Sequence, residues 1–202
     1  MKKHFLVLAV IICALGVQAQ DAGKVFGSPT VIWYGIDFTK AKVLGFGDES
    51  PHKIRDEYFK AWNDVTIDID LAKVFQKDAA YKDPNGISKM NLARETSDIN
   101  TGEEVELTPE VIAEMVKQTP AGQKKVGLAL VFIAQCFNKT AGTATVHVAF
   151  FDVATRKVLW LKKMTGKASG GNSKSAFTAA LKDIFSQIEK KEYKAWKKEA
   201  NY

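Results

Sequence analysis

Side chains that bind metals or act as nucleophiles are scarce in this chain of 202 residues, which has two cysteines and three histidines. His4 and Cys13 fall within the first nineteen residues, so the rest of the chain keeps Cys136, His52 and His147. Neither of these histidines has a cysteine or another histidine at the spacing of a zinc site. One cysteine cannot form an intramolecular disulfide, and its apolar neighbours predict a buried, inert thiol. We therefore expect no metal centre and no covalent crosslink.

Complete catalytic motifs are also missing from the sequence. No Gly-x-Ser-x-Gly turn supplies a nucleophilic serine. Gly166 and Gly171 have the spacing of a P-loop, but Asn172 stands where the motif requires lysine. Counting from Asp64, an EF-hand calcium loop would need glycine at the position of Ile69. The sequence therefore predicts no catalytic residue and no cofactor, and an enzyme is the least favoured class of function.

The stretch 165–175 is rich in glycine and serine and precedes the last helix. We interpret it as a flexible linker in which Ser173 or Ser175 caps that helix. The alternative is a weak anion site at the start of the helix, where these two hydroxyls would act with Lys167 and Lys174.

The amino-terminal segment has the pattern of a secretory signal peptide. Lys2 and Lys3 precede an apolar run from Phe5 to Val17, and a small residue stands at Ala19. The run is shorter than the roughly 20 residues that a membrane-spanning helix needs. A lipid anchor on the cysteine of this run is disfavoured because Ile12, which is not small, precedes it. We expect cleavage after Ala19, export, and a mature chain without a transmembrane segment or a lipid anchor.

The remaining chain, residues 20–202, carries its charges in two separate segments. The acidic middle has no lysine or arginine between Arg94 and Lys117, and it would repel phosphate, so nucleic acid is not an expected partner. The last helix mixes lysines with acidic residues, as solvated helix faces do. Both segments are candidate contacts for another protein or for a second copy, by charge alone. The candidate residues are Glu103, Glu104, Glu106, Lys190, Lys191 and Lys194.

In the first half of the chain, β-branched and aromatic residues predict a strand at Thr30–Phe38. Apolar residues at helical spacing predict a helix at His52–Asn63. Residues 65–77 fit either a strand or a helix, and we favour a helix. Asp83–Gly86 has the composition of a turn. It opens an acidic excursion at about 83–107, within which we expect one short strand.

The second half has clearer patterns. Thr108–Glu110 signals the start of a helix, since it combines a capping residue, proline and an acid. Val126–Phe137 is apolar on both faces, as central strands are. Val146–Phe150 and Lys157–Leu161 follow after short turns, which gives an antiparallel three-stranded meander. A last helix at 175–199 has an apolar stripe. We expect an α/β (α+β) fold, a single domain whose mixed sheet contains this meander and is flanked by helices.

A short internal similarity links Asp37–Leu44 and Asp152–Leu159, which match at four of eight positions. We interpret both segments as hairpin turns with the same chemistry rather than as a duplication.

This order of elements resembles the fold shared by the TolB amino-terminal domain and the CsgG family of bacterial envelope proteins. The resemblance lies mainly in Val146–Trp160, where an apolar strand is followed by aspartate, a turn, Lys-Val and an aromatic residue. It covers the carboxy-terminal third of the chain, and Val31–Phe38 loosely. It implies an envelope protein that works through protein contacts. The CsgG group makes membrane pores with extra strands and a lipid anchor, and neither is evident in this sequence.

The expected function is that of an exported bacterial envelope protein, periplasmic or in the outer envelope, which is not an enzyme. Its expected partner is another envelope protein or a second copy of itself. The alternative is a periplasmic protein that binds a small ligand between the sheet and the loop at 166–175.

Overall fold

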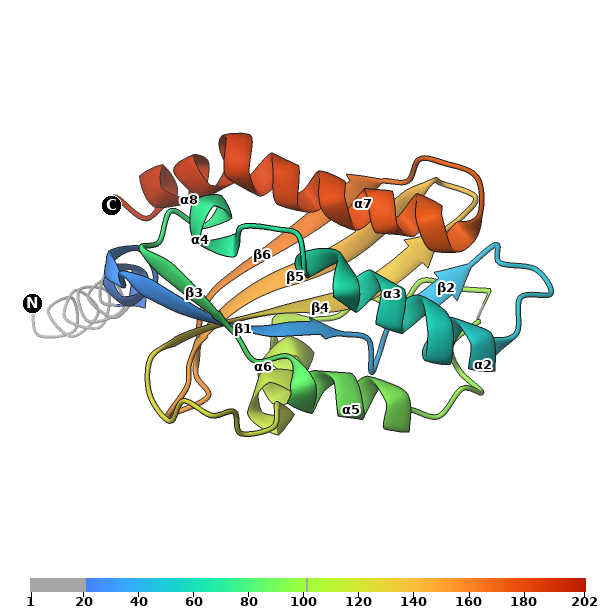
Figure 1. Ribbon diagram of the computed structural model, residues 1–202, viewed down its shortest axis with the longest axis horizontal. Coiled ribbons are helices and arrows are strands. Elements are labelled where there is room, and N and C mark those ends of the chain that lie inside the picture. Colours follow the sequence, from blue (N-terminus) through green and yellow to red (C-terminus); the bar gives the residue numbers. More distant parts are fainter. Residues whose placement is uncertain (1–20, 101) are drawn as a thin grey trace, which may run out of the picture.

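The computed structural model of the protein describes residues 21–100 and 102–202, so the predicted signal peptide lies outside the described residues. The centre of the fold is one mixed sheet (Figure 1). Its strands are β1 (Thr30–Asp37), β2 (Lys42–Leu44), β3 (Ala79–Lys82), β4 (Leu128–Asn138), β5 (Thr143–Asp152) and β6 (Val158–Lys167).

The strands follow the order β3-β1-β4-β5-β6, and β2 also pairs with β4. β1 is parallel to β3 and to β4, whereas β5 is antiparallel to β4 and to β6. The predicted meander is therefore confirmed as β4, β5 and β6, and the α/β class with a mixed sheet is confirmed with it. β4 is buried along almost its whole length because both of its faces are covered. β6 is longer than predicted, since it continues to Lys167.

Helices cover both faces of the sheet (Figure 1). The helical residues 21–27 lie on one face together with α2, α3, α4, α7 and α8, and α5 and α6 lie on the other. Two π-helical turns, Ile54–Tyr58 and Ile188–Glu192, join α2 to α3 and α7 to α8. No helix in the described part of the chain is long and apolar enough to cross a membrane. The helices are α2 (Pro51–Lys53), α3 (Phe59–Asn63), α4 (Leu71–Val74), α5 (Asn85–Ala93), α6 (Pro109–Gln118), α7 (Ser173–Gln187) and α8 (Tyr193–Glu199).

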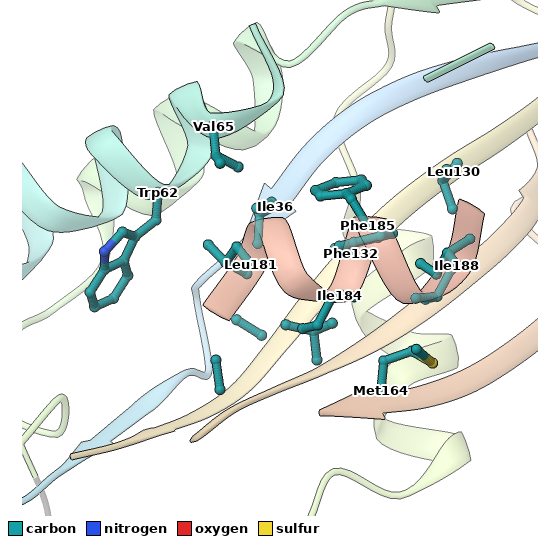
Figure 2. Packing of buried hydrophobic residues seen from close by; sticks show 14 of the residues in the cluster. Ile36, Trp62, Val65, Leu130, Phe132, Met164, Leu181, Ile184, Phe185 and Ile188 are labelled. Atoms are coloured by element: carbon teal, nitrogen blue, oxygen red, sulfur yellow. The ribbon is translucent and has the colours of Figure 1, made fainter. Parts of the chain in front are cut away.

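The main core lies between α7 and the sheet. Phe132 of β4 stacks on Phe185 of α7 with ring centroids 4.7 Å apart, and Trp33 meets Phe132 edge-on at 5.0 Å. Figure 2 shows Ile184 and Phe185 among the buried sheet residues. The predicted apolar stripe of the last helix is the surface that packs here. Cys136 is buried, as predicted, and burial raises the pKa of its thiol to about 12.

The interpretation of Asp37–Leu44 as a hairpin turn is wrong. β1 and β2 do not pair with each other, because both run parallel to β4. The turn chemistry itself is shared: Asp37 accepts from the N–H and the hydroxyl of Thr39, as Asp152 does from Thr155. Such local hydrogen bonds fix the direction of a turn, whereas the partner of the next strand is decided by packing.

The predictions for the middle of the chain need three corrections. The turn expected at Asp83–Gly86 is the start of α5, which packs on β1 and buries Ile87, so the described irregular residues are confined to 94–100 and 102–107. No strand forms in that segment among the described residues, where Val43 and Asn100 make one isolated bridge. The strand Ala79–Lys82 was not predicted, since it has no β-branched residue and exists through pairing with β1.

β3 is short, and side chains replace it along the second half of β1. β3 pairs with Thr30–Trp33 only. Farther along, the Asn91 amide of α5 accepts from the N–H of Phe38 at 2.7 Å and donates to the carbonyl of Ile36 at 2.8 Å. This is the pattern of a parallel strand residue placed opposite Asp37. The side chain therefore completes the ladder where the strand has ended.

Candidate protein-interaction surface

The opposite edge of the sheet is formed by β6, which among the described strands pairs only with β5. In an antiparallel strand the N–H and C=O of one residue point to the same side, and every second residue points the same way. The register between β5 and β6 is unbroken from Leu161 to Lys167. Since the N–H of Lys167 and the C=O of Thr165 bond to α7 instead of β5, the outward-facing residues are Leu161, Lys163, Thr165 and Lys167.

Two side chains of α7 satisfy the far end of this edge. Asp183 accepts from the N–H of Lys167 at 3.0 Å, and Gln187 donates to the carbonyl of Thr165 at 3.0 Å. The two side chains also bond to each other at 2.9 Å. They act on β6 as Asn91 acts on β1, because they supply the hydrogen bonds of a missing strand.

The stretch before these bonds is open. Among residues 21–100 and 102–202, no group bonds to the outward N–H and C=O of Leu161 and Lys163. We call these four backbone groups the free edge. Unpaired groups of this kind are the template on which a further strand adds to a sheet.

Lysines flank the free edge. Lys162 bonds to Glu199 at 2.6 Å, and Lys163 bonds to Glu106 at 2.8 Å. Lysines on an edge strand are a common protection against pairing with a second copy, because the like charges would meet. Both ion pairs are partly exposed, so each contributes little to stability.

A groove of about 650 Å³ lies beside the free edge. Both ends of the described chain form it together with β6. Trp160, in this groove, meets Phe26 edge-on at 5.2 Å, and its buried indole N–H has no partner among the described residues. Tyr202 also lines the groove and is 55% exposed. Tryptophan and tyrosine are the residues most often found at the centre of protein interfaces.

The predicted acidic contacts lie on what we call the acidic strap, residues 102–107, of which only Leu107 is buried. The strap lies on the face of the sheet opposite α7. Gln135 of β4 donates to Glu104 at 2.8 Å and accepts from the N–H of Leu107 at 3.4 Å. The same amide oxygen lies 2.8 Å from Nε2 of His147, so this ring nitrogen carries the proton.

The strap reaches β6 through Glu106, which bonds to Lys163. That hydrogen bond lowers the pKa of Glu106. Burial, with the nearby charge of Lys163, lowers the pKa of His147 and keeps the ring neutral at pH 7. Glu103 is exposed on the same strap.

The predicted basic contacts Lys190, Lys191 and Lys194 are exposed on the other face of the molecule. They lie on the last helical run, where Ile188 and Trp196 pack into the core under α7. The two charged groups selected from the sequence are therefore on opposite faces of the sheet, and one copy does not bring them together. Their contact with a partner stays a prediction.

The prediction that Ser173 or Ser175 caps α7 is wrong. The capping residue is Asn172, whose side-chain oxygen accepts from the N–H of Ser175 at 2.9 Å. Asparagine is as good a cap as serine, and it stands one residue before the helix begins.

The other groups of the predicted anion site are arranged unfavourably. Ser173 is buried, and its hydroxyl donates to the carboxylate of Glu49. A carboxylate at this place repels an anion, and it already takes the hydroxyl that an anion would use. The anion site with Lys167 and Lys174 stays a prediction, which the position of Glu49 disfavours.

The free edge was not found from the sequence. Lys157–Leu161 was recognised as a strand, but its alternation does not reveal whether a strand lies at the edge or the centre of a sheet. The pair Lys162-Lys163 was a usable signal, because lysines are enriched on exposed edges.

No protein-family model and no curated protein matches the chain. Among solved structures, a PelC dodecamer from Paraburkholderia phytofirmans is similar, with a TM-score of 0.30 and 12% identity over 82% of this chain and 91% of that chain. The LpoB C-terminal domain from Salmonella enterica is similar with a TM-score of 0.24 and 10% identity, over 75% and 96%. TM-scores this low carry no argument about fold or function. The resemblance to TolB and CsgG stays a prediction.

Proposed function

We propose that the protein is exported to the bacterial envelope and binds another protein there, without catalysing a reaction. The observation that carries the proposal is the free edge of β6. The outward backbone groups of Leu161 and Lys163 have no partner in the described chain, whereas the neighbouring carbonyl of Thr165 and N–H of Lys167 are satisfied by side chains. The signal-peptide pattern of the sequence supports export.

The position of the groove supports a protein partner. It lies next to the free edge and contains Trp160 and Tyr202, so backbone pairing and burial of an aromatic side chain are available to one partner at one place. A small ligand is the second candidate, because 650 Å³ lies within the size range of small-molecule sites.

Site-specific crosslinking in envelopes of the source cells tests this proposal. A photo-crosslinking amino acid at Leu161, in the full chain with its own signal segment, is expected to give an adduct with one envelope protein. The matched control is Leu92 of α5, which is 52% exposed on a helix that packs on β1, away from the β6 edge, and is expected to give none. Equal adducts from both positions, or none from Leu161, would contradict the proposed surface. Recovery of the unprocessed chain in the cytoplasm would contradict export.

A further inference from the structure

We infer that the partner supplies an extended, acidic segment that adds to the sheet as a strand beside β6. This inference rests on the proposed function and names the chemistry of the partner. Leu161 and Lys163 offer two donors and two acceptors on alternating residues. An extended segment presents its own backbone groups at that spacing, whereas a helix has already used its groups internally.

The positive charge of the lysines next to the free edge favours a partner segment with acidic side chains. Lys162 and Lys163 point to opposite faces of the strand, so a partner strand meets a lysine on each face. Their present partners, Glu199 and Glu106, have side chains 57% and 64% exposed. Carboxylates of an incoming segment can therefore replace them without unfolding any buried element.

The helical run beyond the edge adds to this positive charge. Gln187 contacts β6 at Thr165, and Glu199 contacts it at Lys162, so the helical stretch between these two residues passes along the edge. That stretch has five lysines and two glutamates. A segment docked on β6 thus lies in a positive field on its α7 side.

The same lysines argue against a second copy as the occupant. Two β6 strands paired antiparallel around the free edge would place lysines directly against lysines, which destabilises a sheet. An acidic strand removes that repulsion. The edge therefore disfavours self-pairing and favours a segment of opposite charge.

The groove indicates that the partner segment also carries an apolar side chain. Leu159–Lys162 line both the groove and the start of the free edge, so a segment that continues along β6 passes the ring of Trp160. We expect an apolar side chain in the partner segment beside its acidic residues. Alternation of the two kinds puts acid and apolar groups on fixed faces of the added strand.

The inference is tested by titrating the processed protein with short peptides while observing backbone amide signals by NMR. The probes are a seven-residue peptide of alternating valine and glutamate, its valine–lysine counterpart, and the glutamate peptide with N-methyl groups on one backbone edge. The glutamate peptide is expected to shift the amide signals of Leu161 and Lys163 and to bind at least tenfold more tightly than either other peptide. Equal binding of all three peptides would overturn the inference.

Variants separate charge from backbone pairing. The double change Lys162→Glu with Lys163→Glu is expected to reverse the preference toward the lysine peptide, and Lys117→Glu on α6 is the matched control that keeps it. Lys163→Pro removes an outward N–H, so it is expected to weaken binding at least fivefold more than Lys163→Ala. If the proline and alanine variants fold and bind alike, strand addition is wrong.

The crosslink at Leu161 distinguishes this inference from the function on which it rests. An adduct that maps to an acidic, extended segment of the partner supports both. An adduct that maps to a helix or a basic segment overturns the inference and leaves the proposed function standing. The absence of any adduct from Leu161 would overturn the proposed function itself.

Discussion

The two edges of the sheet differ in how their unpaired backbone groups are satisfied. On the β1 side, β3 ends early, and Asn91 and Asn63 then bond to the backbone of Ile36 and Phe38, all of which are buried. On the β6 side, Asp183 and Gln187 do the same for two groups, after which Leu161 and Lys163 are left open.

The comparison teaches that burial decides which unpaired backbone groups of this sheet must be satisfied from within the chain. A buried unpaired backbone group destabilises a protein by about 1–3 kcal/mol, so the β1 side cannot remain unsatisfied. The free edge of β6 is at the surface, where water or a partner satisfies it. A surface that binds a strand must be of this second kind, since a buried edge leaves no room for one.

The largest effect on stability is expected from Gly166→Ala, which disrupts the close contact between α7 and β6. A Cβ atom at Gly166 would lie 2.0 Å from the carbonyl oxygen of Ala180, so the helix backbone has to move. We expect a loss of about 4 kcal/mol in the free energy of unfolding, or failure to fold, measured by urea denaturation. Gly171→Ala, where a Cβ atom has no neighbour within 4 Å, is the control and should change little. Similar losses for both would show that the helix does not pack as described.

A proline pair tests which groups of β6 face outward. Lys162→Pro removes an N–H directed at β5 and should cost about 3 kcal/mol in unfolding free energy. Lys163→Pro removes an outward N–H and should cost about 1 kcal/mol or less, since edge strands tolerate proline there. Thermal denaturation of the two variants measures both losses. If Lys163→Pro were the more destabilising, the assignment of outward and inward backbone groups on β6 would be wrong.

On the β1 side, Asn91→Ala leaves the N–H of Phe38 and the carbonyl of Ile36 buried and unpaired. We expect a loss of about 2 kcal/mol in unfolding free energy, measured by urea denaturation. Replacement of exposed Leu92 by alanine is the matched control on the same helix, and it should be close to neutral. An Asn91 variant as stable as this control would mean that water satisfies the β1 edge as well.

A smaller effect is expected from Gln187→Ala, which removes a bond at the surface. The carbonyl of Thr165 would become available to water, so unfolding free energy should fall by about 1 kcal/mol. Gln118→Ala on α6, whose side chain is exposed, serves as the control. If the acidic peptide binds the Gln187 variant over a longer part of β6, the amide signal of Thr165 will also shift.

The smallest effect concerns pH and the acidic strap. Because the pKa of His147 is lowered in the folded state, the unfolded chain takes up its proton first as pH falls below the ordinary value of about 6.5. Stability is therefore expected to fall between pH 7.5 and 5.5, and His147→Gln should flatten that dependence. Urea denaturation at both pH values measures it. This window lies above the range in which the carboxylates of Glu106 and Glu49 titrate, since both have lowered pKa values. An unchanged slope in the variant would assign the dependence to another group.

Local patterns predicted the elements that have a strong period or a capping residue. Thr108 begins α6 as expected, with its side chain accepting from the N–H of Val111. The meander and the last helix were also recognised, because a long apolar run, short turns and an apolar stripe at helical spacing are visible there. The strand and helix within residues 79–93 were not predicted, since the strand has no β-branched residue and the helix begins with residues typical of turns.

The candidate site could be predicted only in part. The lysines and the aromatic residue of β6 are visible in the sequence, but the free edge depends on which strand is last in the sheet. The charged groups chosen from the sequence lie on two faces, because charge shows that a side chain is solvated and not where it lies. Export, the partner and the absence of catalysis stay proposals.

The sequence by itself determined the class of elements in the second half and the burial of Cys136, because periodicity and apolar composition act over neighbouring residues. Only the tertiary structure decided that β6 is an edge strand and that Asn91 and Gln187 replace missing strands. It also decided that Glu49 occupies the start of α7. These features join residues far apart in the chain, and their hydrogen bonds exist only after the helices have packed on the sheet.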